Sequence, residues 1–447
     1  LWWGHRIPVW SIRKECSLRN VYADLLGTLL QDTCLNDDDD KEIAIRIDGQ
    51  LIATDTMEFQ RFAESDDAKL DDVSMHEVTI CTTCEKLYDN FNDFGFRQDP
   101  DVLDTWFSSW LWPFATMGWP ENTETLKKFY PTTDLVTGPD IIFFWVARMI
   151  MAGYEYMGEL PFKNVYFTGI IRDKQGRKMS KTLGNSPDPL DLIARYGADA
   201  LRFGTMRSAP LGQDVLFDEK DVELGRNFCN KLWNACRFRQ MVGSGTGVSP
   251  VQGGEDSKSN RTGETPVPPQ FEVQGEINSS LLTSDDKWIL LKLHEAIREI
   301  TDALNTYNFS TAVQALYRFF WSEYCDWYVE ASKAVSFGDN PERKANTLAV
   351  IDFVLSHTLR LFHPFLPFIT EELWHGMGYA TDMPEGQGGK TIMNAPWPKP
   401  FDQDFRDHYA LDDCYIEFAN QKYEVVTQGR NLRRIGNIQA GKKVKFV

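Results

Sequence analysis

The chain has 447 residues, 42% of them hydrophobic and 25% charged, which is ordinary for a globular protein and long enough for two or three folding units. The net charge of −18 argues against non-specific nucleic-acid binding by the whole surface, because phosphate affinity grows with lysine and arginine contacts. No apolar run reaches the ~18 residues of a membrane span, and the eight cysteines are too scattered for a disulfide framework. We therefore expect no membrane partner and a reducing, cytoplasmic location.

An acidic, weakly patterned segment occupies residues 22–84, and we expect it to form a peripheral insertion. It ends in Cys81 and Cys84, whose C-x-x-C spacing is half of a tetrahedral zinc site. Only Cys16 and Cys34 are available as partners in this region, and both are poorly spaced. Bound zinc and a metal-free knuckle are therefore equally open alternatives.

Between residues 101 and 206, short apolar runs alternate with helical patterns. The stretch NVYFTGII (164–171) has the β-branched and aromatic content of a buried strand. A helical pattern follows it after a loop, and strand, loop and helix in this order predict an α/β domain. We place this domain at residues 1–21 and 85–240.

The helix after that loop is predicted by DPLDLIARYG (188–197). Asp188 is a good N-cap, and Pro189 suits the first helical position, where no backbone N–H is needed. Gly197 suits the stop, because glycine readily ends a helix. The segment thus carries its own start and stop signals.

The loop itself, GRKMSKTLGNSPDP (176–189), lies where open α/β sheets bind ligands, beyond the end of a strand. The ammonium groups of Lys178 and Lys181 can stabilise charge that develops on a leaving pyrophosphate, and Ser180 can hydrogen-bond a phosphate oxygen. Taken alone, two lysines on a loop are more often simply solvated. A phosphate-binding loop and a solvated loop are both open on these residues.

Residues 242–278 are rich in Gly, Ser, Thr and Pro and poor in large apolar groups, which predicts a disordered insertion. Over residues 282–400 apolar side chains then recur three and four positions apart, which predicts a bundle of three or more amphipathic helices. Core packing explains these stripes better than a cofactor site. The stripes consist of Leu293, Ile297, Ile300 and Leu304, of Val313, Leu316, Phe320, Tyr324 and Trp327, and of Leu348, Ile351, Leu355, Leu359 and Phe362.

Residues 401–447 begin a basic extension, because arginines and lysines cluster after the last acid, Glu424. Such an end could face RNA. A solvated terminal tail is the more frequent outcome for a charge cluster of this kind. Both interpretations are open on the sequence.

Several motifs then occur together. KMSKT (178–182) closely resembles the KMSKS motif of class I aminoacyl-tRNA synthetases, with a threonine that keeps the last hydroxyl. The chain is similar to the valyl-tRNA synthetase family outside residues 22–80 and 242–278. The resemblance implies an α/β fold, the second half of a Rossmann-like catalytic domain, followed by an all-α helical bundle that binds the anticodon. The further stretches that carry it are LWWGHRIPVW (1–10), DVLDTWFSSWLWPFATMGWP (101–120), TGPDIIFFWVARMIM (137–151), GADALRFGTM (197–206), EYCDWYVEASK (323–333) and HPFLPFITEELW (363–374).

The resemblance implies an ATP site. Lys181 would contact the ATP phosphates, with Lys178 assisting as the loop closes. Gly138 and Asp140 match the family's ribose-facing Gly-x-Asp, in which glycine lets the backbone approach the sugar and the carboxylate accepts bonds from ribose hydroxyls. For Asp140 a second role is open, as an acid in the first turn of a helix that begins at Pro139.

The resemblance also implies a valine pocket lined by Trp106, Ile141 and Trp145. Ile141 and Trp145 are four residues apart and therefore share one face of a helix. Two indoles and a branched aliphatic side chain could form a rigid, dry slot for an isopropyl group. Ordinary core packing of the same three residues is the alternative.

The implied function is that of a valine-tRNA ligase, in which ATP and Mg²⁺ activate valine before its transfer to tRNA(Val). The alternatives are an isoleucyl-type synthetase and a non-catalytic tRNA-binding relative. The family's HIGH motif and its editing domain are expected upstream of Leu1. We therefore expect the chain to be a carboxyl-terminal portion, inactive alone, of a monomeric enzyme.

Overall fold

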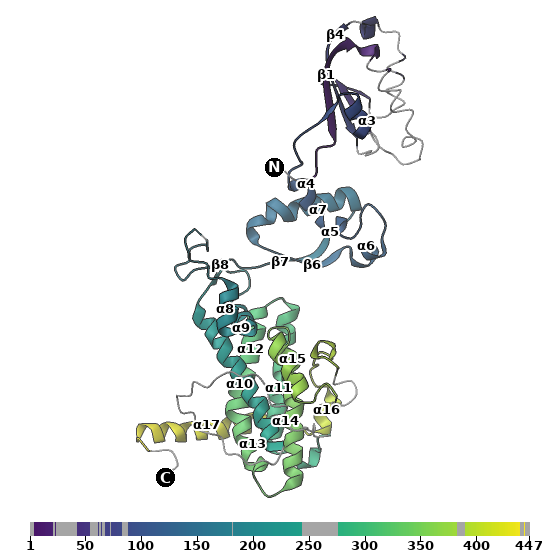
Figure 1. Cartoon of the computed structure of the whole chain (residues 1–447). Helices are drawn as coiled ribbons and strands as arrows, with labels where there is room; N and C mark the ends of the chain where they lie inside the picture. Colours follow the sequence, from purple (N-terminus) through teal and green to yellow (C-terminus); the bar gives the residue numbers. More distant parts are fainter. Residues whose placement is uncertain are drawn as a thin grey trace, which may run out of the picture. The chain divides into compact units, whose positions relative to one another are not determined.

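The computed structural model divides the chain into two compact units (Figure 1). The first consists of Leu1–Leu135 and Asp140–Val165, and the second of Val136–Pro139 and Tyr166–Val447. None of the helices in the part of the chain that the structure describes is long and apolar enough to cross a membrane. The described residues are 4–20, 23, 43–53, 61, 64, 68–71, 73–82, 88–180, 182–243, 276–381, 389–438 and 442.

A five-stranded antiparallel sheet opens the first unit, in the order β3-β2-β4-β1-β5. One of its faces is apolar: Trp10 and its strand partner Ile80 are both buried, and Trp10 packs against Phe91 of α3 (Tyr88–Asp93). Alternation of side chains along each strand places these residues on the same face. The strands are β1 (Val9–Ser17), β2 (Ile43–Ile47), β3 (Gln50–Ala53), β4 (Val73–Thr82) and β5 (Arg97–Gln98).

This sheet differs from the expected domain boundaries. Strand β1 was assigned to the catalytic domain and residues 22–84 to a peripheral insertion. In the structure, β1 pairs with β4 over its whole length, from Val9 opposite Cys81 to Ser17 opposite Val73. The two strands share one apolar face, so the expected boundary at residue 21 falls inside a single sheet.

The remainder of the first unit surrounds a small aromatic core. Phe114, Leu126, Tyr130 and Ala152 are buried, and Trp119 packs edge-on against Phe114 at 5.3 Å between ring centroids. The elements are α4 (Trp106–Ser109), α5 (Trp112–Ala115), α6 (Glu124–Phe129), the 3₁₀ helix η4 (Pro139–Ile141), the π-helix η5 (Ile142–Val146), α7 (Ala147–Ala152) and the π-helix η6 (Gly153–Met157).

The buried strand expected at residues 164–171 is instead two shorter, partly exposed strands, β7 (Phe162–Phe167) and β8 (Ile171–Arg172). β7 pairs with β6 (Thr132–Thr137), and β8 pairs in parallel with β9 (Val215–Leu216). Between β7 and β8 the backbone of Gln213 approaches Gly169 so closely that a Cβ there would overlap its carbonyl oxygen. This close approach lies at the break between the two strands.

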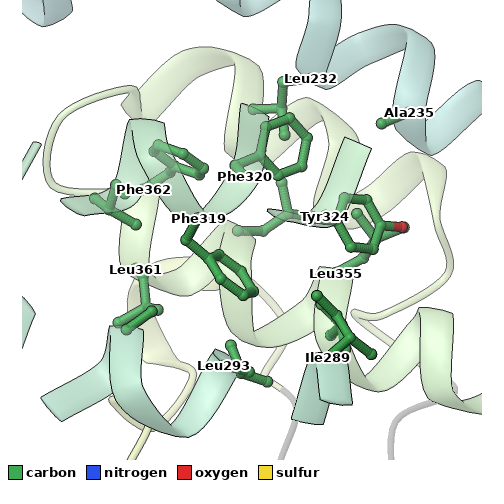
Figure 2. Close-up of a cluster of buried hydrophobic side chains, with 14 of the residues drawn as sticks. Leu232, Ala235, Ile289, Leu293, Phe319, Phe320, Tyr324, Leu355, Leu361 and Phe362 are labelled. Carbon is green, nitrogen blue, oxygen red and sulfur yellow. The ribbon is translucent and has the colours of Figure 1, made fainter. Parts of the chain in front are cut away.

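The second unit is a helical bundle around one apolar core (Figure 2). The predicted apolar stripes are confirmed, since Leu293, Phe320, Leu355 and Phe362 are buried together there. The helices are α8 (Pro189–Tyr196), α9 (Ala198–Arg207), α10 (Glu219–Gly243), α11 (Ser284–Asn305), α12 (Phe309–Tyr317), the π-helix η8 (Arg318–Tyr328), α13 (Val329–Ser336), α14 (Pro341–Phe362), α15 (Pro367–Gly376), α16 (Gln403–His408) and α17 (Cys414–Ile435), with the 3₁₀ turns η7 (Ser279–Leu281) and η9 (Ile392–Asn394).

The bundle begins earlier in the chain than expected. The catalytic domain was expected to run to residue 240, but the rings of Phe203 on α9 and Phe228 on α10 stack at 4.6 Å and both belong to the bundle core. The two helices pack closely because Gly204 on α9 leaves room for the backbone of Asp221 on α10, and Gly225 on α10 leaves room for the backbone of Ala200 on α9. Most of the expected insertion at 242–278 lies outside the described residues.

A buried ion pair joins α10 to α14. Arg239 donates to Asp352, which also accepts from the hydroxyl of Tyr379 at 3.2 Å, and all three residues are almost fully buried. A buried charge is costly unless it is paired and hydrogen-bonded. The pair therefore fixes how these helices face each other.

Candidate functional site: a lysine loop, an indole pair and a cationic groove

The loop with the two lysines follows β8 as a tight hairpin. Asp173 and Gly176 close its turn, with the Gly176 N–H donating to the Asp173 carbonyl at 2.9 Å. Gly176 has φ 78°, which a residue with a side chain seldom adopts. The strand then returns with Lys178 opposite Arg172. Lys178 is thus held near the end of a strand, with its side chain exposed.

After Lys178 the chain runs through Ser180 towards α8. The Ser180 hydroxyl accepts from the Thr182 N–H at 3.2 Å, and the Ser180 N–H donates to the side-chain oxygen of Asn185 at 2.9 Å. Lys181, the lysine expected to contact ATP phosphates, lies outside the described residues. The structure therefore places Lys178 and Ser180 on one loop between β8 and α8.

The helix that follows confirms its sequence signals. α8 begins at Pro189, and the Asp188 side chain accepts from the Leu190 N–H at 2.9 Å. It ends at Tyr196, and Gly197 follows with φ 92°. The capped start of α8 therefore fixes the point at which the loop ends.

Asp173, which no motif in the sequence singles out, accepts several of the side-chain hydrogen bonds described for this loop. Its carboxylate is buried and accepts from the N–H groups of Gln175 and Arg177, from the Arg177 side chain at 2.7 Å and from the Asn185 side chain at 2.9 Å. The Asn185 hydrogen bond is the largest cause that lowers the pKa of Asp173 to about 2. The only signal in the sequence was a turn-forming Asp three residues before a Gly.

Two further ion pairs tie the hairpin to the chain around β9. Arg172 contacts Asp214, and Lys174 contacts Asp218 at 2.9 Å. The pKa of each carboxyl is lowered, in both cases first by the side-chain hydrogen bond from its cation. The base of the loop is therefore anchored while its tip stays exposed.

Gly138 and Asp140 lie where β6 passes into η4. Gly138 follows the last residue of β6, and Asp140 is exposed in the first turn of η4, which begins at Pro139. The carbonyl of Thr137 just before them accepts from the Thr168 N–H at 2.9 Å. Asp140 is in the position expected of an acid at a helix start, and its proposed ribose contact stays a prediction.

Trp145 and Trp106 lie on neighbouring elements of the first unit. The indole N–H of Trp145 donates to the Ser109 carbonyl at 3.0 Å, which ties η5 to α4, where Trp106 is the first residue. Trp106 is partly exposed, and the guanidinium of Arg148 lies over its ring. Ile141 is half-buried at the end of η4. Arg148 was missed because a cation–π contact has no fixed sequence spacing.

A groove of about 630 Å³ lies on the bundle between α10, η8, α13 and α17. Its lining mixes aromatic rings with cations. Arg430 lies 5.2 Å above the Trp327 ring, and Lys333 lies 5.9 Å above the Phe238 ring. Lys231, which also lines the groove, lies 4.1 Å above the ring of Trp321, just outside the lining. Lys231 also pairs with Asp326, and Lys333 with Glu330.

Such a surface suits single-stranded RNA, because bases stack on aromatic rings and cations meet phosphates. The sequence could not show it, because its residues come from four helices and their exposure is set by packing. The sequence predicts Trp327 only as part of an apolar core stripe, and Arg430 only as one of the cations of the basic end.

The half zinc site is not completed within the described residues. Cys81 is half-buried on β4, and burial raises the pKa of its thiol, the opposite of what a metal ligand needs. Cys16 lies opposite Ser74, seven residues along β4 from Cys81, which is roughly 23 Å at a strand's rise. No group of three potential ligands occurs among the described residues, while Cys34 and Cys84 lie outside them. Cys16 is therefore excluded as a partner of Cys81.

Comparison with known proteins agrees with this architecture. Residues 49–218 match the family of class I tRNA synthetases (I, L, M and V), and residues 286–447 match the anticodon-binding domain of tRNA ligases. The chain therefore contains a portion of a class I tRNA synthetase catalytic domain and a tRNA-ligase anticodon-binding domain. Its fold class, a catalytic portion followed by a helical anticodon-binding domain, is as the sequence predicted.

Within that family the likeness is to valine-tRNA ligases. The enzyme of Carboxydothermus hydrogenoformans is 39% identical over 447 residues, which is 100% of this chain and 39% of that protein. That of Thermotoga maritima is 37% identical over 445 residues, again 39% of the protein, and that of Geobacillus stearothermophilus is 45% identical over 306 residues, 68% of this chain and 31% of that protein. The chain thus spans about two fifths of these relatives.

A solved structure has the same fold. The LeuRS-tRNA-LeuAMS ternary complex of Agrobacterium radiobacter has a TM-score of 0.51 and 20% sequence identity, and the match covers 68% of this chain and 34% of that one. At this identity the likeness concerns the fold alone.

Proposed function

We propose that the chain supplies the lysine loop and the anticodon-binding bundle of a valine-tRNA ligase. The observation that carries the proposal is the identity of 37–39% to valine-tRNA ligases along essentially the whole chain, loop and bundle included. The substrates are valine, ATP and tRNA(Val). A monomeric enzyme and a cytoplasmic location stay predictions.

In the first step the valine carboxylate attacks the α-phosphorus of ATP, giving valyl-adenylate and pyrophosphate. Lys178 and Lys181 stabilise the negative charge that develops on the leaving pyrophosphate, and Ser180 donates to a phosphate oxygen. Gly138 lets the backbone approach the ribose, and Asp140 accepts from its hydroxyls. Mg²⁺ would be held mainly through the ATP phosphates, where it would neutralise part of their charge.

In the second step a terminal ribose hydroxyl of tRNA(Val) takes the valyl group and releases AMP. The chain contributes mainly positioning and electrostatic stabilisation, because no covalent enzyme intermediate is needed. Trp106, Ile141 and Trp145 would enclose the isopropyl group. The bond from Trp145 to Ser109 supports this role, because it fixes one indole relative to the helix that carries the other.

The groove on the bundle is our candidate for the contact with tRNA. Aromatic rings and cations from four helices converge there, and the groove lies within the part of the chain that matches anticodon-binding domains or on α10 beside it. An unstacked anticodon base would enter between the rings. Arg430 and Lys333 would meet the neighbouring phosphates.

The test is Lys181→Ala in a full-length protein that contains this chain. Valine-dependent exchange of pyrophosphate into ATP should fall about 100-fold or more, as is usual when a preorganised charge-stabilising group is removed. Lys220→Ala, an exposed lysine on α10, is the matched control and should exchange normally. Normal exchange by Lys181→Ala would refute the role of the loop.

A further inference from the structure

Asp173 and Asn185 lie at the two ends of the lysine loop and are hydrogen-bonded to each other. The Asn185 side-chain N–H₂ donates to the Asp173 carboxylate at 2.9 Å across a sequence separation of 12 residues. The same N–H₂ group lies 3.4 Å from the Lys178 carbonyl, which accepts from it. One amide therefore connects the base of the loop with the backbone of a lysine.

The Asn185 side chain uses both ends of its amide. Its oxygen accepts from the Ser180 N–H at 2.9 Å while its nitrogen donates to Asp173. Only an amide offers a donor and an acceptor in this arrangement. A carboxylate at 185 would face the carboxylate of Asp173, and an apolar side chain would leave Asp173 and Ser180 without this partner.

Apolar packing contributes little to the conformation of the loop tip. Gly176 and Gly184 have φ values of 78° and 62°, and glycine is the residue with the largest freedom in the unfolded chain. Lys178 and Thr182 are exposed, so apolar burial does not order the tip. The hydrogen bonds that the Asp173 carboxylate accepts and those that the Asn185 amide makes therefore join the two ends of the loop directly.

We propose that Asp173 and Asn185 are positioning residues, a carboxylate–amide clasp that closes the two ends of the loop and fixes the backbone of Lys178–Ser180. The clasp holds the backbone of Lys178 in one conformation for contact with the phosphates. It touches no substrate. Its kinetic consequence rests on the proposed function, whereas its effect on loop order does not.

The first experiment measures loop order in this chain by hydrogen exchange of the loop amides. Asp173→Asn replaces the oxygen that accepts from the side chains of Arg177 and Asn185 by an N–H₂ group, so donors face donors. Asn185→Asp places two carboxylates face to face. Each should speed exchange about tenfold, as expected when a local hydrogen-bonded unit opens. The reversed pair Asp173→Asn with Asn185→Asp restores an amide–carboxylate bond between the two positions but not the bonds to the Arg177 side chain and the Lys178 carbonyl, so it should recover part of the protection. Asp191→Asn, on the exposed side of α8, is the control.

Circular dichroism would show that each variant keeps the bundle. Single variants that exchange like the wild type would overturn the clasp. So would a reversed pair no better protected than the worse single variant, because coupled residues must show non-additivity.

The second experiment measures pyrophosphate exchange in the full-length protein, per active site titrated. The single variants should lower kcat about tenfold and raise the KM for ATP, leave the KM for valine unchanged, and be rescued in part by the reversed pair. A purely structural role would reduce the number of active sites but not the rate at each, and that result would overturn the positioning role. If the wild type itself fails to exchange, the proposed function fails, while amide exchange still decides whether the clasp orders the loop.

Discussion

In the helical bundle the chain is held by apolar side chains that recur at helical spacing, whereas in the lysine loop it is held by a few polar side chains. The bundle core buries rings such as Phe228, Phe320 and Phe362 completely. The loop buries one carboxylate, Asp173, and relies on hydrogen bonds around it. The bundle should therefore tolerate conservative changes, while the loop should depend on single atoms.

The bundle core also contains buried polar groups, and breaking the buried ion pair between Arg239 and Asp352 should have the largest effect. Asp352→Ala would leave Arg239 charged and almost fully buried, which should lower the free energy of unfolding by about 3–5 kcal/mol. Urea denaturation followed by circular dichroism measures it. Replacing both partners by apolar residues, Arg239→Met with Asp352→Leu, should recover much of the loss. A loss below about 1 kcal/mol for the single variant would show that the pair behaves like a surface pair.

The second prediction concerns how the free energy of unfolding depends on pH. Burial is the main cause that lowers the pKa of His357 to about 3, with Arg360 adding to it. The unfolded chain has an ordinary histidine pKa near 6.5, so it takes up the proton first as pH falls. The contribution of His357 to the free energy of unfolding is therefore fully present above about pH 6.5 and is lost as the pH falls towards 3. Between pH 7 and pH 4.5 this loss should be about 2–3 kcal/mol.

His357→Gln should remove this part of the pH dependence. His294 and His363, whose pKa values are also lowered by burial, contribute equally in both proteins. His408→Gln, at an exposed position, is the control. Urea denaturation at pH 7 and at pH 4.5 gives the change in the free energy of unfolding between the two pH values. The same change in the wild type and in His357→Gln would contradict a buried neutral imidazole.

The smallest effect on stability is expected in the groove. Arg430→Ala and Lys333→Ala remove exposed or half-exposed cations, so the free energy of unfolding should change by less than about 0.5 kcal/mol. Binding of tRNA(Val) should weaken, and its salt dependence should fall by about one unit for each phosphate that is no longer neutralised. Arg343→Ala, exposed at the start of α14 and outside the groove lining, is the control. Equal weakening by all three would argue for a diffuse charge effect.

The difference between the two regions also explains what the sequence could predict. The bundle helices and the capped helix after the loop were predictable, because periodicity and signals such as Asp188, Pro189 and Gly197 are local. The pairing of β1 with β4 was not, because the two strands are separated by more than 50 residues and their common apolar face appears only after folding.

Site residues that belong to a sequence motif could be predicted. Residues that join the site only through contacts in the folded chain could not. Lys178 and Ser180 were selected from their motif, while Asp173 and Asn185 were not, because their hydrogen bonds join turns 12 residues apart. Arg148 and the groove residues were missed for the same reason. The roles of Trp106, Ile141, Trp145, Gly138, Asp140 and Lys181 stay predictions from the resemblance.

The most direct test of the account is amino-acid-dependent exchange of pyrophosphate into ATP by a full-length protein containing this chain, with valine, isoleucine and leucine measured in parallel. The account predicts fastest exchange with valine, and its loss in Lys181→Ala. Faster exchange with isoleucine or leucine would contradict the assigned substrate. Absence of exchange with all three, while tRNA(Val) still binds, would instead identify a non-catalytic tRNA-binding relative.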